Sequence, residues 1–407
     1  MRHQSHRSWQ TVPSLVFVLT VIGMVSNAPP AEAELKFVPA LVVSERYDSN
    51  VLFATGRKTE DFVTTVAPEL RADYTGRLVE GSLRGGLVVG SYAKNSNLNY
   101  VAANGSLVLN LDQLVGRLDK RAKLQVAESF FFTPELPAFV SATAGFNPFA
   151  TGIQPQRVNT YTNTASANGN FELSALTNLR ASYTHSILRF GTVLGNPQQG
   201  GLFRTTFQTV NAGPQFKVSR DDTVSLTYQY QQADFAGGQV PGFTTQGGTV
   251  GWARVLNQRL TMNLAAGAAD IQPTNRVSFI GDASLQWRAA ENSTFTFSYT
   301  RSVLPSFAVA ALPLESQIFK VALLHRVTDP LTLTAVADYA HNQSNVTGEH
   351  LLFRSYDAVL RLNYAITRVL TGSLTYTYTK FMQSFSSLGT TSFDRNQVIV
   401  SLRAEWK

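Results

Sequence analysis

The residues of this chain best suited to acid–base catalysis or to metal binding are its six histidines. They are His3, His6, His185, His325, His341 and His350. The first two precede the apolar run of a predicted signal peptide, the next two are isolated in strand-like segments, and the last two lie in or beside one predicted loop. None has the spacing of a nucleophile and its base, and the last two form only a loose set with Glu349 for a metal. We therefore predict no catalytic residue, no metal site and no cofactor, in a protein that is not an enzyme.

A second group with chemical potential consists of charged residues that alternate with apolar residues along the chain. The basic members are Arg71, Arg84, Arg121, Lys123, Arg180, Arg288, Lys320, Arg326, Arg361 and Arg403. The acidic members are Glu69, Asp73, Glu80, Asp119, Asp282 and Glu405. If the apolar face meets lipid, these side chains line a lumen, and their basic excess predicts a weak preference for anions. Alternatively, the charges pair across neighbouring strands and only solvate a structural interior.

The alternation that places these charges on one face is clearest between Ser355 and Thr379. Apolar and polar residues alternate from Tyr356 to Tyr364, and the pattern resumes after a polar turn near Thr367. A period of two indicates β-strands. Aromatic residues stand at both ends of each apolar face, which is typical of strands that cross a membrane, because such rings settle at the two interfaces.

The same pattern recurs from Leu35 to the C-terminus, with short turns alternating with longer connections. It predicts about eighteen strands. Sixteen is the alternative, because the segments Arg157–Ser174 and Leu202–Val218 have no clear apolar face. The predicted fold class is all-β: a transmembrane, antiparallel, up-and-down β-barrel of the bacterial outer-membrane type, with short turns in the periplasm and long loops outside.

Two girdles of aromatic residues are predicted on the lipid-facing surface of this barrel. The periplasmic girdle consists of Tyr74, Phe216, Trp252, Trp287, Tyr364 and Trp406. The outer girdle consists of Tyr92, Tyr230, Tyr299, Tyr339, Tyr356 and Tyr378.

The longest connection, Thr133–Gln156, contains few charges and three phenylalanines, Phe139, Phe146 and Phe149. Such a loop exposes apolar surface if it extends into water. One hypothesis is that it folds inward as a constriction of the lumen. The other is that it packs against the remaining outer loops.

The N-terminus has the features of a secretory signal: basic residues, the apolar run Leu15–Val25 and a small-residue cleavage site that ends at Ala33. We predict a signal peptide over residues 1–33 and a barrel over residues 34–407. The chain has no cysteine, and its net charge of +7 comes from dispersed basic residues, so we expect no nucleic-acid partner. The last predicted strand closes on the aromatic residue Trp406. This ending resembles the C-terminal signal that barrel-assembly machinery recognises, with the difference that Lys407 follows the aromatic residue.

The first predicted strand and the turn after it carry a resemblance to a known family. Glu45 to Phe53, then Lys58, then Asp61 to Pro68, resemble the start of the putative β-barrel porin type 2 proteins, which include exosortase-associated outer-membrane barrels. The resemblance implies a barrel near polysaccharide export or surface assembly, with polysaccharide or its export apparatus as a partner beside outer-membrane lipid. The family offers no established catalytic residues.

Three hypotheses about function follow. In the first, the barrel is a porin-like channel or export conduit for small solutes or polysaccharide. In the second, it is a closed structural or docking barrel of a surface exopolysaccharide assembly system. The third, an outer-membrane hydrolase, lacks a catalytic trio in the sequence.

Overall fold

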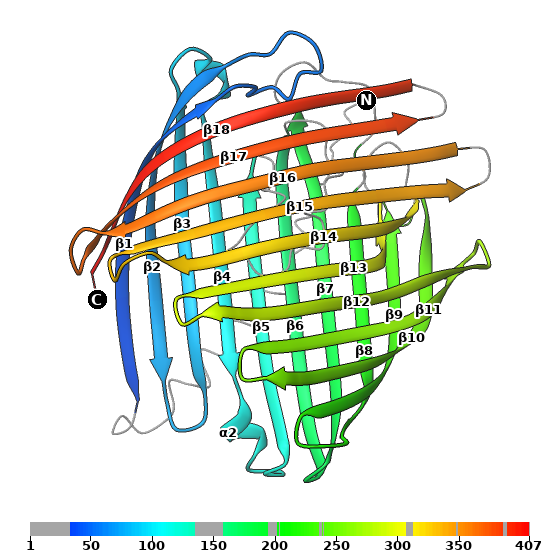
Figure 1. The fold of residues 1–407 in the computed structure, drawn as a ribbon. Coiled ribbons are helices and arrows are strands. Elements are labelled where there is room, and N and C mark those ends of the chain that lie inside the picture. Colours follow the sequence, from blue (N-terminus) through cyan, green and yellow to red (C-terminus); the bar gives the residue numbers. More distant parts are fainter. Residues whose placement is uncertain are drawn as a thin grey trace, which may run out of the picture.

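The computed structural model describes residues 33–134, 158–193, 202, 204–235, 238, 240–306, 312–346, 349–385 and 389–406. In this part of the chain, eighteen antiparallel strands form one sheet (Figure 1). Each strand pairs with the next, and β18 also pairs with β1, so that the sheet closes into a barrel. The predicted fold class and the predicted count of eighteen strands are confirmed.

The strands are β1 (Glu34–Asp48), β2 (Asp61–Thr75), β3 (Glu80–Tyr92), β4 (Tyr100–Asn110), β5 (Ala122–Thr133), β6 (Val158–Ser174), β7 (Thr177–Val193), β8 (Thr205–Lys217), β9 (Asp222–Phe235), β10 (Val240–Asn257), β11 (Leu260–Gln272), β12 (Arg276–Ala290), β13 (Ser293–Pro305), β14 (Pro313–Arg326), β15 (Leu331–Val346), β16 (Glu349–Ala365), β17 (Leu370–Phe385) and β18 (Gly389–Glu405).

The two segments without a clear apolar face form β6 and β8. Each is hydrogen-bonded on both sides, β6 to β5 and β7, and β8 to β7 and β9. Pairing with two neighbours satisfies the backbone polar groups even where the side-chain pattern is weak. The residues 1–32 of the predicted signal peptide and the predicted constriction residues Phe139, Phe146 and Phe149 lie outside the described residues.

Both ends of the barrel chain lie at the same rim, since Glu34 pairs with Thr75 and Glu405 pairs with Ala40. We call this rim the termini end and the opposite rim the loop end. The connection from β4 to β5, at the termini end, contains the short helix α2 (Asp112–Val115), and a 3-10 turn, η2 (Ser96–Leu98), follows β3 at the loop end. Among the described residues, no helix has the length and apolar character needed to cross a membrane.

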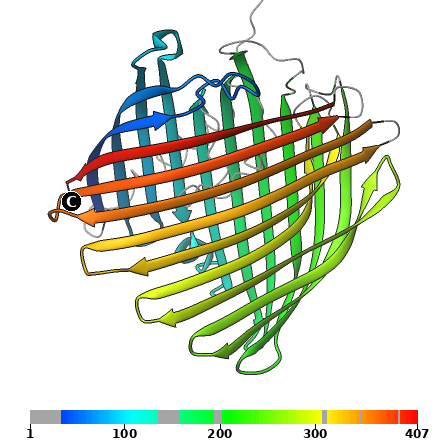
Figure 2. The same ribbon diagram turned by 45° about the horizontal axis from the view of Figure 1, so that its top comes forward.

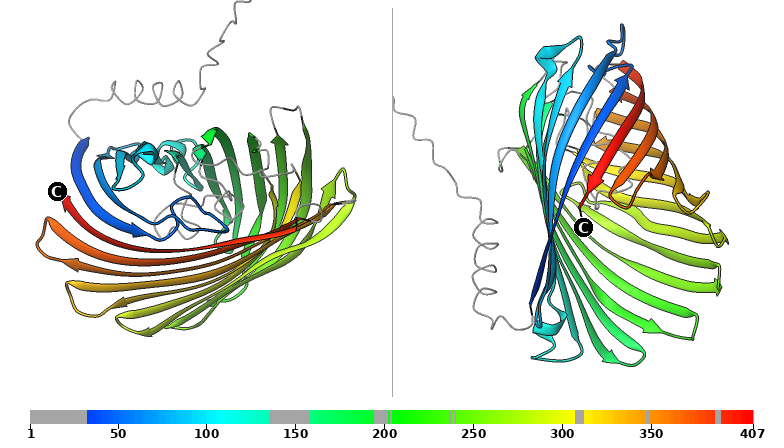
Figure 3. Two further views of the ribbon diagram at one scale, coloured as in Figure 1. Left: turned by 90° about the horizontal axis from the view of Figure 1, so that it is seen from above. Right: turned by 90° about the vertical axis from the view of Figure 1, so that its left-hand side faces the viewer.

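The barrel is flattened. In Figures 1 and 2, strands β13 to β17 run at a steep angle to strands β4 to β8, so that two crossing walls face each other. Seen from above, the ring of strands has one long and one short dimension (Figure 3). Opposing walls therefore come close together across the short dimension.

Successive residues along each strand alternate between the outside and the inside of the barrel. On β1, Leu41 and Val43 are 37% and 41% exposed and lie opposite Ala404 and Leu402 of β18 on the outer surface. Ser44 points inward and lies opposite other small polar residues on both neighbouring strands. Large, exposed apolar side chains thus cover the outside, an arrangement that suits contact with lipid.

The largest cluster of buried apolar residues lies inside the barrel, near the loop end. Its rings pack closely: the centroids of Phe381 and Phe393 are 5.4 Å apart, and those of Phe353 and Phe385 are 5.8 Å apart. We call this set the loop-end cluster; its buried members are Phe53, Leu188, Phe207, Ala233, Phe235, Phe243, Ala269, Ile271, Ile280, Val303, Leu314, Leu351, Phe353, Phe381, Phe385 and Phe393.

Candidate functional site

The lumen of the termini half is lined by charged and polar side chains. The strand register places ten of the predicted lumen charges on the inward face. They are Arg71, Arg84, Lys123, Arg180, Asp282, Arg288, Lys320, Arg326, Arg361 and Arg403. The neighbouring acidic residues Glu69, Asp73, Glu80 and Glu405 lie on the same face.

The eleventh predicted lumen residue, Arg121, is on the other side. It lies in the turn before β5, and its guanidinium is 4.8 Å from the ring centroid of Phe171, an outward-facing residue of β6. It also pairs with Asp119 in the same turn, at 2.7 Å. The prediction that Arg121 lines the lumen is wrong, because a turn residue at the rim does not continue the alternation of the strand that follows it.

The Arg121 guanidinium and its hydrogen bonds lower the pKa of Asp119 to about 2. This carboxylate lies outside the strands, at the termini rim.

Some of the inward charges are paired with carboxylates. Arg71 is 3.0 Å from Asp73, and Lys123 is 3.1 Å from Glu172. Arg403 reaches two carboxylates, Glu69 at 2.9 Å and Glu405 at 3.1 Å. Among the described residues, no ion pair involves Arg84, Arg180, Arg288 or Arg326. Part of the basic excess is thus neutralised locally and part of it is left to act on the lumen.

Neutral polar side chains cover the wall formed by β7 to β13. A cavity of about 400 Å³ lies against this wall. Half of its lining residues carry hydroxyl or amide groups, for example Asn211, Thr227 and Gln229, and Arg180 and Asp282 are its inward charges. Such a surface offers hydrogen-bond donors and acceptors to water and to polar solutes.

Two inward carboxylates that were not among the predicted lumen residues, Asp338 and Asp357, lie directly opposite each other on β15 and β16. Lys320 is the register partner of Asp338, and the Thr379 hydroxyl donates to Asp357 at 2.7 Å. The alternation of residues along β15 and β16 could have placed both carboxylates on the inward face. They lie in the row of residues next to the loop-end cluster, because Ser355, two positions from Asp357, pairs with Phe381.

The loop-end cluster was also absent from the sequence prediction. Apart from Val303, its strand-borne members share the inward face with the polar residues: on β16, Phe353, Ser355, Asp357 and Arg361 all point inward. The face is therefore the same along the strand, and only the residue type changes from charged to apolar toward the loop end. This change from charged to apolar inward residues is visible in the sequence and could have indicated the cluster.

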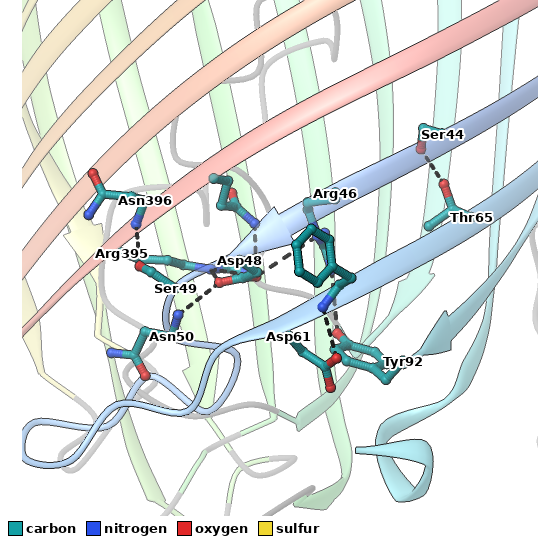
Figure 4. Close-up of polar contacts among 12 residues, drawn as sticks. Ser44, Arg46, Asp48, Ser49, Asn50, Asp61, Thr65, Tyr92, Arg395 and Asn396 are labelled. Atoms are coloured by element: carbon teal, nitrogen blue, oxygen red, sulfur yellow. Dashed lines mark hydrogen bonds and ion pairs between the residues drawn. The ribbon is translucent and has the colours of Figure 1, made fainter. Parts of the chain in front are cut away.

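The seam between β1 and β18 carries a buried polar network (Figure 4). Asp48 is fully buried and accepts hydrogen bonds from Arg395, from Nε at 3.0 Å and from Nη2, while Gln397 Nε2 donates to it at 3.0 Å. Arg46 Nε lies 3.8 Å from the same carboxylate. We call Asp48, Arg395 and Gln397 the seam clasp. Asp48 belongs to the stretch that carries the family resemblance, and the clasp joins the first strand to the last.

Ten of the eleven tyrosines and tryptophans predicted for the girdles lie on the outward face. They are Tyr74, Trp252, Trp287, Tyr364 and Trp406 near the termini end, and Tyr230, Tyr299, Tyr339, Tyr356 and Tyr378 nearer the loop end. Phe216 also points outward.

Tyr92 is the exception among the predicted girdle residues. It is 3% exposed, packs inside the barrel against Val63 and Leu98, and its hydroxyl accepts a hydrogen bond from Arg46 at 3.4 Å. Its assignment to the lipid-facing girdle is wrong, because position 92 shares the inward face with Val63.

Three of the described histidines, His185, His325 and His341, lie on different strands. His185 lies on the outward face opposite Gln208, and His325 Nδ1 is 2.7 Å from Ser293 Oγ at the termini end. His341 lies beside Tyr339 and Arg354 on the outer surface. In the part of the chain that the structure describes, no group of three or more His, Asp or Glu side chains is placed to hold a metal ion.

Comparison with protein families locates a match in the last third of the chain. Residues 269–406 match the family model of putative beta-barrel porin 2. The match confirms the family resemblance first seen at the N-terminal strands. The barrel is of the outer-membrane, porin-like type. No curated protein matches the chain.

Solved structures similar to this chain include OccK2 (OpdF) from Pseudomonas aeruginosa, with 13% identity, 91% of this chain and 98% of that chain covered, and a TM-score of 0.47. The outer membrane protein opdK from the same organism has 13% identity and a TM-score of 0.45, with 91% of this chain and 99% of that chain covered. The siderophore receptor PirA from Pseudomonas aeruginosa has 8% identity and a TM-score of 0.45, with 93% of this chain and 81% of that chain covered.

Proposed function

We propose that this chain is a non-enzymatic, porin-like channel for small polar solutes, whose lumen is closed at the loop end by the loop-end cluster. The observation that carries the proposal is the contrast along one inward face: partly exposed charges and hydroxyls in the termini half, and buried aromatic rings in the loop half. A narrow apolar segment of a pore excludes ions by dewetting. The channel conducts when the cluster parts.

Once open, the channel has a weak preference for anions. The support for this is the group of inward guanidinium groups without ion pairs among the described residues, namely Arg84, Arg180, Arg288 and Arg326. The paired cations at Arg71, Lys123 and Arg403 add little, because a neighbouring carboxylate cancels most of their field.

In the membrane, the termini end faces the periplasm and the loop end faces the exterior, as short turns and long loops do in bacterial barrels. The signal peptide is removed after Ala33, and β18, with Trp406 directly after it, is recognised by the assembly machinery. The outward aromatic rings settle at the two lipid interfaces.

A second candidate function is a closed barrel that serves as a structural or docking element of a surface exopolysaccharide assembly system, with polysaccharide or its export apparatus as the partner. The same loop-end cluster favours it, because sixteen buried apolar members make a firm closure. In this case the polar termini half holds water without passing solutes.

Single-channel recording on the refolded mature protein in a planar bilayer separates the two functions, with an asymmetric-salt reversal potential measured on the same channels. The control is Phe381→Ser, which places a hydroxyl in the loop-end cluster. Openings with a weak anion preference, more frequent in the variant, support the channel. Silence of both proteins, in samples that migrate as folded, heat-modifiable barrels, supports the closed barrel. Clear cation selectivity contradicts the anion preference.

A further inference from the structure

We infer that the β1–β2 connection, residues 49–60, is a lid on the loop-end mouth of the lumen, held by the seam clasp and closed by insertion of Phe53 into the loop-end cluster. The inference rests on the proposed channel function and adds the moving part. Seen from above, this connection lies inside the ring of strands (Figure 3).

Phe53 differs from every other buried member of the loop-end cluster in one respect: it is carried by a connection, and the others are carried by strands. It is 3% exposed, and its ring centroid is 5.6 Å from that of Phe393 on β18. A strand-borne ring leaves the cluster only if the sheet deforms. Phe53 can leave when the connection swings, with all strand pairs intact.

The backbone of the lid is held in a defined shape. Phe53 has φ of +55°, a conformation that residues with a Cβ rarely adopt. The buried side chain of Asn50 keeps this turn closed: its Oδ1 accepts from the Ala54 amide at 2.9 Å, and its Nδ2 donates to the carbonyls of Ala54, at 3.0 Å, and Asp394, at 3.3 Å. The turn is thus tied both to itself and to β18.

The seam clasp connects the lid to the barrel wall. Asp48, the last residue of β1, accepts from the Asn50 amide at 3.1 Å and from Arg395 of β18. The Arg395 guanidinium also lies 4.7 Å from the ring centroid of Phe53. One buried cation therefore contacts both the anchor of the lid and the ring that closes the lumen.

A second, exposed tie joins the lid to the mouth. Lys58 Nζ is 2.6 Å from Asp394 Oδ2, with both side chains about 40% exposed. Salt screens an exposed pair far more than a buried one. The base of the lid is thus anchored firmly, through Asp48, Ser49 and Asn50 to β18 and through the buried side chain of Val51, whereas the tie farther along the connection is weak. This is the arrangement expected of a segment that opens about its base.

The test measures access to the lumen beneath the cluster. Ser355 is lumen-facing, 1% exposed and in register with Phe381. Because the chain contains no cysteine, Ser355→Cys supplies a single thiol. Its labelling rate with a membrane-impermeant maleimide is measured on the full mature protein in vesicles, alone and combined with Phe53→Ser. The lid account predicts that Phe53→Ser raises the rate about tenfold or more, since labelling follows the open population.

The matched control is Phe385→Ser, which removes a buried ring of the same cluster from a strand. The lock is Lys58→Cys with Asp394→Cys in the Phe53→Ser protein, without the Ser355 substitution. A short bifunctional methanethiosulfonate joins the two thiols through disulfides. Single-channel currents are recorded on this protein: the lock suppresses openings, and a reducing agent, which cleaves the disulfides, restores them.

The outcomes separate the lid from the channel. Faster labelling in Phe53→Ser without any current supports the lid and contradicts the channel. An unchanged labelling rate in Phe53→Ser, or currents unaffected by the lock, overturns the lid whether or not the channel conducts. If Phe53→Ser does not fold, Asp48→Asn combined with Arg395→Gln takes its place. This pair removes both charges of the clasp and the guanidinium beside Phe53, and the same results are expected to support or contradict the lid.

Discussion

The two halves of the lumen use the same inward face for opposite purposes. In the termini half, inward charges such as Arg403 and Glu69 remain partly hydrated, with side chains 36% and 22% exposed. In the loop half, Asp48 and Phe353 are fully buried. The difference shows that strand alternation assigns residues to the inside, whereas the distance between opposing walls decides whether the inside is an aqueous space or a packed core.

The largest expected effect is on stability, from removing a ring of the loop half. Phe353→Ala leaves a cavity in a fully buried site and lowers the free energy of unfolding by about 3–5 kcal/mol. Val108→Ala, at an inward position of the termini half that is 39% exposed, costs well under about 1 kcal/mol. Urea unfolding in detergent micelles, followed by the heat-modifiable gel shift, compares them. Equal costs would remove the distinction between the two halves.

The next contrast is between ion pairs. Asp48→Ala leaves Arg395 buried without its main partner and lowers the free energy of unfolding by about 3 kcal/mol. Asp73→Ala, which removes the exposed partner of Arg71, costs far less, because solvent screens this pair. The same urea titrations measure both. A cost for Asp73→Ala that matches that of Asp48→Ala would mean that the termini half is not hydrated.

A smaller effect is expected on ion selectivity. Arg84→Gln combined with Arg180→Gln removes two inward cations and shifts the reversal potential of the open channel toward zero selectivity, by a few-fold in the permeability ratio. Arg354→Gln, on the outward face beside His341, removes a cation without changing the lumen and serves as control. An equal shift in the control would show that the lumen charges do not set selectivity.

The smallest effect concerns pH at the termini rim. The pKa of Asp119 is about 2, below the ordinary value near 3.9, so its pairing with Arg121 supports the fold above about pH 4 and is lost as the pH falls toward 2. Carboxyl NMR titration is the measurement. Arg121→Gln, or about 1 M salt, raises the pKa toward its ordinary value. A pKa that stays near 2 in Arg121→Gln would contradict the assigned cause.

Much of the barrel was predictable because a period of two is local. The eighteen strands and the inward face of residues such as Arg361 need only the alternation of neighbours. The errors at Tyr92 and Arg121 arose at strand ends, where alternation has no continuation to test it. The seam clasp was not predictable, because Asp48 and Arg395 are far apart in sequence. The inward apolar residues of the loop-end cluster could be seen in the sequence, but their packing could not, because the approach of two walls depends on the flattening of the whole barrel.

The central claim, that the loop half closes a polar lumen, is tested most directly by labelling from the outside. Asn211 lines the lumen cavity of the termini half, and Asn211→Cys supplies the only thiol. An impermeant maleimide is added to intact Gram-negative cells that display the protein, with and without Phe353→Ser and Phe381→Ser. The account predicts that Asn211→Cys is protected while the loop-end cluster is intact and is labelled when both rings are removed. Labelling at the same rate with the cluster intact would contradict it.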